Sequence, residues 1–234
     1  MWGRPSSSNP VAALPDDPAA RLAGVRARVD AAAGAWGRDP AGVTLIAVSK
    51  THGVEAIRPL LEAGQRDFGE NRVAEAQAKW PALRAEFPDA RLHMVGALQS
   101  NKAAAAAALF DAIHSVDRPS LVAALGAAKR EAARQPELFL QVNIGDEPQK
   151  AGCAPGEIGA LLEAARAAGL EIAGLMCLPP QGLEPAPYFA LLAKLAGDHG
   201  LTGLSMGMSG DYEAAVSLGA THVRVGTALF GERG

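Results

Sequence analysis

The chain is poor in cysteine and in aromatic residues, and it has no long apolar run. Its 234 residues include two cysteines, Cys153 and Cys177, and only 5% of them are aromatic. Two cysteines do not make a disulfide framework, and Cys177 lies in an apolar stretch where a buried, reduced thiol is expected. The longest apolar stretch, Ala103 to Phe110, is too short to cross a bilayer. No membrane segment is therefore expected.

Concentrated charge of one sign is also missing. The formal net charge is −3, the isoelectric point is about 6.0, and the lysines and arginines are scattered. Because nucleic-acid-binding proteins usually cluster these residues, no nucleic-acid partner is expected. The first residues do not combine positive charge with a following apolar core, so no signal peptide is expected either. These features predict a soluble, cytoplasmic protein.

The beginning of the chain differs in composition from the rest. Its first 18 residues contain four prolines and the run Ser6 to Ser8. We expect residues 1–16 to be a disordered lead-in. Residues 17–234 have the length of a single large α/β domain.

Short apolar stretches alternate with helical patterns along this domain. Many of the stretches are continuously apolar, as parallel strands are when helices cover both faces of the sheet. Eight strand–helix units in this length predict a single (β/α)₈ TIM-type barrel. The expected strands are residues 43–49, 67–69, 92–95, 112–116, 138–143, 171–178, 204–206 and 222–225.

The last expected strand is followed by nine residues, too few for a full helix. We expect the N-terminal helix, which begins at Asp17, to close the outer ring of the barrel instead. An open doubly wound sheet is the alternative architecture. The first strand is not followed by a G-x-G-x-x-G motif, which argues against that alternative.

Lys50 comes directly after the first expected strand, although lysine is rarely buried. The functional residues of a barrel lie at the carboxyl ends of its strands. An amine that is partly desolvated there keeps more of the neutral form that attacks a carbonyl. The alternative is a lysine that simply extends its charged end into solvent. Position alone leaves both interpretations open.

Two glycine-containing segments follow the last two expected strands. Ser209 and Gly210 precede a helical pattern, and Gly226 and Thr227 follow the final strand. Taken alone, Ser209 is more simply explained as an ordinary helix cap. Barrels often bind phosphate with the loops after strands seven and eight, so the two segments together predict a phosphate site.

Arg224 lies inside the last expected strand, on the same face as His222. If that face is the barrel interior, the buried arginine needs a partner, either an ion pair or an acceptor on a ligand. An amine, a phosphate site and an interior arginine at one barrel mouth suggest pyridoxal 5′-phosphate. Its aldehyde would meet Lys50 and its ring nitrogen would face Arg224.

Eight motifs follow one another along the chain. They are "AVSKT" (47–51), "FGENRVAEAQAK" (68–79), "HMVGALQSNK" (93–102), "VDR" (116–118), "QVNIGDEPQKAGC" (141–153), "GLMCLPP" (174–180), "LSMGMSGD" (204–211) and "VRVGTALFG" (223–231). In this order they resemble the motifs of the pyridoxal-phosphate homeostasis proteins. The resemblance covers about residues 17–233.

The resemblance implies a barrel like the N-terminal domain of alanine racemase, with pyridoxal phosphate as the cofactor. It implies that Lys50 is the Schiff-base lysine. The other implied contacts are Ser209, Gly210, Gly226 and Thr227 with the phosphate, Asn71 and Met206 with the ring, and Arg224 with the ring nitrogen. Three departures, at His52-Gly53, Arg72 and Gly210, concern contacts at the rim.

We expect a non-catalytic carrier rather than an enzyme. Enzymes with a strong electron sink place a carboxylate beside the ring nitrogen of the cofactor, which keeps that nitrogen protonated. An arginine only donates hydrogen bonds and cannot play this part. Tyr188 and Tyr212 lie in expected helices away from the strand ends, and the chain has no room for the second domain of alanine racemase. We therefore expect no catalytic residue and a monomer that meets apo-enzymes only transiently.

Two other functions stay open. One is an amino-acid enzyme of the alanine racemase type that uses pyridoxal phosphate and Lys50 as its base. The other is a regulatory module whose partner recognises the loaded state. His93, His114 and His222 all lie on expected strands, but their spacing does not match a metal motif, and no metal is expected.

Overall fold

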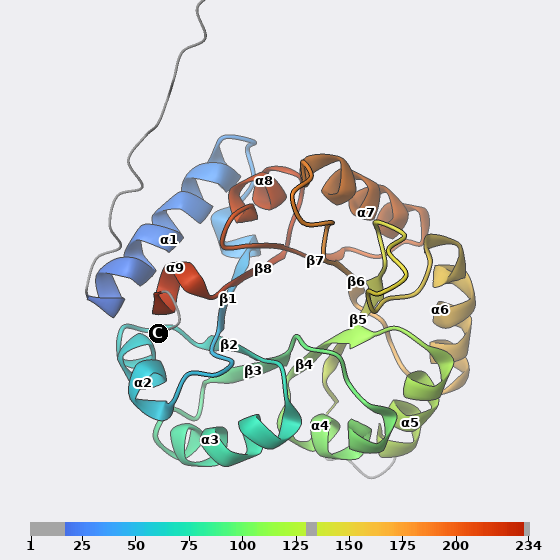
Figure 1. Ribbon diagram of the computed structural model, residues 1–234, viewed down its shortest axis with the longest axis horizontal. Coiled ribbons are helices and arrows are strands. Elements are labelled where there is room, and N and C mark those ends of the chain that lie inside the picture. The colour runs from blue at the N-terminus through green and yellow to red at the C-terminus, as the bar shows by residue number, and fades with distance from the viewer. Residues whose placement is uncertain (1–16, 130–134, 232–234) are drawn as a thin grey trace, which may run out of the picture.

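The computed structural model describes residues 17–129 and 135–231. These residues form a closed barrel of eight parallel strands in sequential order, with helices around it (Figure 1). The predicted (β/α)₈ TIM-type barrel is confirmed. The expected lead-in over residues 1–16 lies outside the described residues.

The strands and helices alternate along the whole described chain. The strands are β1 (Thr44–Val48), β2 (Asp67–Glu70), β3 (Arg91–Met94), β4 (Ala112–Val116), β5 (Glu137–Val142), β6 (Gly174–Cys177), β7 (Gly203–Met208) and β8 (His222–Val225). The helices are α1 (Pro18–Gly34), α2 (Val54–Glu62), α3 (Val73–Glu86), α4 (Ala103–Leu109), α5 (Pro119–Lys129), α6 (Ile158–Ala167), α7 (Ala186–Asp198), α8 (Tyr212–Ser217) and α9 (Thr227–Phe230). Within the described ranges, no helix is both long and apolar enough to cross a membrane.

Helix α1 completes the outer ring beside the short α8 and α9 (Figure 1). Leu22, Val25 and Val29 repeat at helical spacing, and all three are buried. The Arg21 side chain donates a hydrogen bond from Nε to the carbonyl of Leu229 in α9 over 2.7 Å. The expectation that the N-terminal helix closes the ring is therefore confirmed.

Side chains fill the interior of the barrel, so it is a packed core and not a channel. Ile46, Phe139 and Met176 come from three different strands, and each is 0% exposed. The His114 ring stacks on the Phe139 ring with the centroids 4.4 Å apart. Polar side chains are thus mixed into the core below the mouth, and they need hydrogen-bond partners there.

Strands β7 and β8 pair unevenly. Ser205 lies opposite His222 and Met208 lies opposite Arg224, so three steps along β7 match two along β8. Gly207 accommodates the extra residue with φ +93°, a conformation that other residues rarely adopt. This bulge changes which side chains of β7 face the barrel mouth.

Both cysteines are buried and free. Burial raises the pKa of Cys153 to about 12 and that of Cys177 to about 12. Both thiols therefore stay protonated near neutral pH and behave as small apolar side chains. This agrees with the reduced, buried thiol expected at Cys177.

Candidate functional site

One cavity lies at the carboxyl ends of the strands. Its volume is about 330 Å³, which is within the range of small-molecule sites. Seven of the residues predicted to bind a cofactor line it, namely Lys50, Asn71, Ser209, Gly210, Arg224, Gly226 and Thr227. Val48, Val95, Leu178 and Met208 complete the lining. The barrel thus brings together residues from both ends of the sequence.

Met206 is the predicted residue that the structure places elsewhere. It is 0% exposed and belongs to the hydrophobic core cluster, which includes the packed faces of the surrounding helices. The methionine in the cavity lining is Met208. Met206 follows Ser205, whose hydroxyl bonds Arg224 inside the barrel, so Met206 faces the surrounding helices. The bulge comes after Met206 and turns Met208 towards the cavity, so the structure does not bring Met206 together with the other predicted residues.

Lys50 sits in a tight turn directly after β1 and is partly buried. In this turn the His52 amide donates to the Ser49 carbonyl over 3.1 Å. Thr51 has φ +66°, a conformation that costs a residue other than glycine about 1–3 kcal/mol. Its amide donates to Glu75 Oε1 over 2.7 Å, and this bond holds the strained turn in place.

A second lysine supports the same turn from below. Lys79 Nζ donates to the carbonyls of Ser49 and His52, each over 3.1 Å. It also pairs with Glu70 at 2.7 Å and with Glu75 at 2.9 Å. Glu70 is fully buried and accepts a further hydrogen bond from the Ser49 hydroxyl over 2.7 Å. Sequence reasoning missed this support, although Glu75 and Lys79 have the spacing of a helical ion pair.

The two predicted phosphate segments are joined by a hydrogen bond. The Gly226 amide donates to the Ser209 hydroxyl over 3.1 Å. Ser209 does not cap α8, because that helix begins at Tyr212 and Asp211 occupies the capping position. The interpretation of Ser209 as an ordinary helix cap is therefore wrong. The loops after β7 and β8 form one continuous surface.

This surface offers several hydrogen-bond donors to an anion. Thr227 begins α9, and the first amides of a helix have no partner within the helix. The hydroxyls of Ser209 and Thr227 lie in the lining of the same cavity. Together, amides and hydroxyls of this kind can hold a phosphate group.

Arg224 lies in the barrel interior and is 4% exposed. Its Nη1 donates to the Ser205 hydroxyl over 2.6 Å, and its Nη2 donates to the Cys177 carbonyl over 2.9 Å. Burial lowers the pKa of Arg224, but an arginine still carries its charge at neutral pH. In the described part of the chain, Arg224 has no carboxylate within ion-pair distance.

Three histidines meet in the interior below Arg224, with ring centroids 5.3–6.2 Å apart for His93, His114 and His222. Burial lowers the pKa of His222 to about 3 and holds that of His114 well below its usual range. Both rings are therefore neutral at neutral pH. Among the described residues, no group of three His, Cys, Asp or Glu side chains is placed to hold a metal ion.

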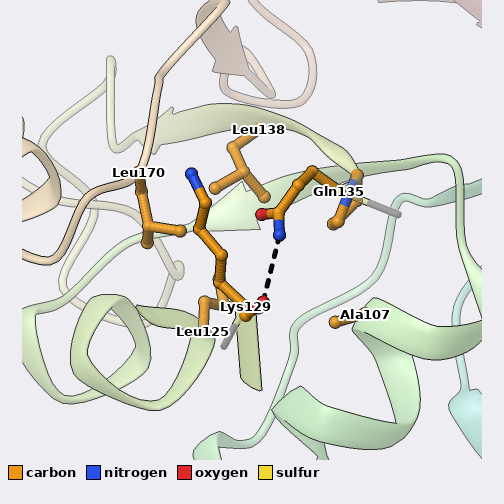
Figure 2. Close-up of a pocket in the computed structure, with 7 residues that line it drawn as sticks. Ala107, Leu125, Lys129, Gln135, Leu138 and Leu170 are labelled. Carbon is orange, nitrogen blue, oxygen red and sulfur yellow. Dashed lines mark hydrogen bonds between the residues drawn. The ribbon is translucent and has the colours of Figure 1, made fainter. Parts of the chain in front are cut away.

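Another hollow lies at the amino-terminal ends of the strands and is shown in Figure 2. Lys129, Leu138 and Leu170 are part of its lining, and its volume is about 10 Å³. The Gln135 side chain closes it by donating to the carbonyl of Lys129 over 3.2 Å (Figure 2). A space of this size holds about one water molecule, so the hollow is not a ligand site.

The fold and the mouth cavity together define a (β/α)₈ barrel with a lysine and the loops after β7 and β8 at one mouth cavity. Residues 22–234 match the family described as "Alanine racemase, N-terminal domain". A relative from Pseudomonas aeruginosa, named pyridoxal phosphate homeostasis protein, is 44% identical over 223 residues, which are 92% of this chain and 95% of the relative. A relative of the same name from Escherichia coli K12 is 37% identical over 228 residues, which are 93% of this chain and 97% of the relative. The chain belongs to the pyridoxal phosphate homeostasis protein family.

Solved structures agree with this assignment. PipY of Synechococcus elongatus, solved without pyridoxal phosphate, has a TM-score of 0.80 and 44% identity, and the match covers 91% of this chain and 99% of PipY. PipY solved with pyridoxal phosphate bound has a TM-score of 0.79, and the match covers 92% of this chain and 100% of PipY. Alanine racemase from Clostridium difficile, with a TM-score of 0.69 and 12% identity, shares the fold over 57% of its own length.

Proposed function

We propose that this chain binds pyridoxal 5′-phosphate at the barrel mouth through a Schiff base with Lys50, and that it carries the cofactor without using it in catalysis. The observation that carries the proposal is the common cavity of Lys50, the two phosphate segments and Arg224. The solved complex of PipY with pyridoxal phosphate supports the choice of ligand, because PipY is 44% identical to this chain.

The side chains around the cavity match the parts of this cofactor. Val48, Val95 and Leu178 give an apolar wall for an aromatic ring. The joined loops at Ser209 and Gly226 offer hydroxyl and amide donors to the phosphate. The Lys50 amine lies in the same lining, where it can reach an aldehyde. Asn71 lines the cavity as well and is proposed to contact the ring.

The environment of Arg224 favours a carrier over an enzyme. Bound pyridoxal phosphate supplies an aldehyde to the lysine and, in enzymes, an electron sink whose strength depends on the ring nitrogen. Arg224 only donates hydrogen bonds, so it cannot act as the carboxylate that keeps the ring nitrogen protonated. A neutral ring nitrogen weakens the electron sink.

No tyrosine is placed to act as a second acid or base at the cavity. Tyr212 is 2% exposed, and the Arg28 guanidinium of α1 lies 5.9 Å from its ring centroid. Tyr188 packs on the hydrophobic core cluster from α7. Neither residue is part of the cavity lining. This arrangement favours a carrier over an enzyme, and we propose that the carrier is a monomer that hands its cofactor to apo-enzymes in brief encounters.

We also propose a cytoplasmic location. Two buried, free cysteines suit a reducing compartment, where thiols stay unpaired.

The alternative function is an amino-acid enzyme with Lys50 as base, and one experiment separates it from the carrier. The loaded protein is incubated with L-alanine in deuterated water, and α-proton exchange is followed by NMR. The carrier predicts no exchange, together with transfer of the cofactor to an apo-enzyme that requires it. Exchange at enzyme-like rates, on the order of 1 per second or faster, would overturn the carrier proposal.

A further inference from the structure

A continuous line of hydrogen bonds runs through the barrel interior behind the mouth cavity. Arg224 Nη1 meets Ser205 Oγ at 2.6 Å, and Ser205 Oγ meets His114 Nδ1 at 2.8 Å. His114 Nε2 lies 3.0 Å from His93 Nδ1, and His93 Nε2 lies 2.9 Å from Asp67 Oδ1. We call these five residues the relay. It begins in the cavity lining and ends at the first residue of β2, at the opposite end of the barrel.

The interior members of the relay are isolated from water. His93, His114 and Ser205 are each 0% exposed, and Arg224 is 4% exposed. Asp67 is the open end, because its side chain is 22% exposed. Water therefore does not compete for the interior bonds, and each buried polar atom needs its partner in the relay.

With one hydrogen on each imidazole, the chemistry of the two ends fixes the direction of every proton. A guanidinium only donates, so the Ser205 oxygen accepts from Arg224 and its own hydrogen is free for His114 Nδ1. His114, which is neutral, then carries its hydrogen on Nε2 and donates it to His93. His93 in turn donates from Nε2 to the Asp67 carboxylate.

The opposite direction leaves an unfavourable contact. With a hydrogen on Nδ1 of both histidines, the bare Nε2 of His93 would face the carboxylate of Asp67, and two acceptors would meet at 2.9 Å. With singly protonated imidazoles, the relay is therefore directed from the arginine to the carboxylate. Hydrogen bonds aligned in this way polarise one another.

We propose that Asp67, His93, His114 and Ser205 are positioning residues for the cofactor ring, and that they couple the mouth of the barrel to Asp67 at its far end. The proposal assumes the proposed function, because it concerns how Arg224 is presented to pyridoxal phosphate. Ser205 and the Cys177 carbonyl hold two edges of the guanidinium. The relay sets how firmly Ser205 holds the Nη1 edge of the guanidinium, and how much charge the guanidinium directs to the cofactor ring.

The test is a double-mutant cycle between the two ends of the relay. Asp67→Asn keeps the shape of the side chain and removes its charge, and Ser205→Ala removes the link between His114 and Arg224. Affinity for pyridoxal phosphate and the absorbance maximum of the bound cofactor are measured for both variants and for the double variant. We expect Asp67→Asn to weaken binding roughly fivefold or more and to shift the absorbance maximum. In the Ser205→Ala background, Asp67→Asn should have no further effect.

Distant mutations with no shared partner normally add, so this loss of effect would be specific to the relay. His222→Gln is the matched control, because His222 lies in the same interior layer but bonds through Nδ1 to the Thr221 hydroxyl, outside the relay. In the His222→Gln background, Asp67→Asn should keep its full effect. An equal effect of Asp67→Asn with and without Ser205 would overturn the proposal.

A measurement on the protein without added cofactor tests the relay independently of loading. Nitrogen-15 NMR of the wild type should show both His93 and His114 protonated at Nε2, and adding pyridoxal phosphate should shift both N–H resonances. Protonation at Nδ1 in either histidine would contradict the proposed direction. If the wild type does not bind pyridoxal phosphate, the proposed function fails while the NMR result still decides whether the relay exists. If the wild type binds and Asp67→Asn matches it in affinity and spectrum, only the coupling fails.

Discussion

The amide of Gly226 donates a hydrogen bond to the hydroxyl of Ser209 over 3.1 Å. This bond links the loop after β7 to the loop after β8, and the two strands themselves pair through an uneven register. Two segments that are 17 residues apart in sequence therefore present their donors on one surface. A phosphate group held there would touch both loops at once.

Ser209→Ala and Thr227→Val should each weaken binding of pyridoxal phosphate without unfolding the barrel. Each change removes a hydroxyl placed to bond a charged group, which is worth about 1.5–3 kcal/mol. Affinity should fall roughly tenfold to hundredfold in fluorescence or absorbance titrations. Pyridoxal, which has no phosphate, is the control ligand, and its affinity should hardly change in either variant. Equal losses for the two ligands would place the phosphate elsewhere.

Lys50→Ala should abolish the covalent bond to the cofactor and leave weak non-covalent binding. The change removes the only amine that lies in the described lining of the cavity, while Ser209 and Gly226 keep their contact. Reduction with borohydride followed by peptide mass spectrometry should find the cofactor on Lys50 in the wild type and on no peptide in the variant. Lys194→Ala, at an exposed lysine outside the cavity lining, is a control for general loss of lysine. Trapping of the cofactor on a different lysine, to the same extent in the wild type and in Lys50→Ala, would disprove the assignment.

Lys79→Met should destabilise the whole protein and loosen the turn that carries Lys50. It leaves the Glu70 carboxylate buried without its cation, and breaking a buried ion pair in this way costs about 3–5 kcal/mol. The free energy of unfolding from urea titration measures the loss. Adding Glu70→Gln removes the uncompensated charge, so the double variant should regain part of the stability. A double variant less stable than Lys79→Met would contradict this account.

The free energy of unfolding should fall as the pH is lowered from about 6.5 towards 3. In the folded protein burial lowers the pKa of His222 to about 3 and that of His114 well below its usual range, whereas both titrate near 6.5 when unfolded. Between these values the unfolded state binds more protons, so each histidine removes about 1.4 kcal/mol of stability per pH unit of acidification. Urea titrations at pH 7, 6, 5 and 4 measure the slope. His222→Gln should reduce the slope of the free energy of unfolding against pH by about 1.4 kcal/mol per pH unit, the contribution of one proton. An unchanged slope would show that His222 is not neutral in the core.

The sequence alone determined the architecture and the end of the barrel that carries the site. Alternating apolar runs and helical patterns require a parallel sheet covered by helices, and the strand ends of such a sheet meet at one rim. This is why Lys50, Arg224 and the segments at Ser209 and Gly226 could be assigned to one mouth before any contact was known. Two-residue periodicity also placed Arg224 and His222 on one face of β8, and the structure shows that this face is the interior.

Tertiary structure alone decided how these residues are oriented and connected. The bulge at Gly207 turned Met208 towards the cavity, because one inserted residue reverses the faces of the strand beyond it. The Ser209–Gly226 bond, the Lys79 support and the relay to Asp67 each join residues from different strands or turns. Such contacts depend on strand register and on burial from water, and the local pattern of residues determines neither.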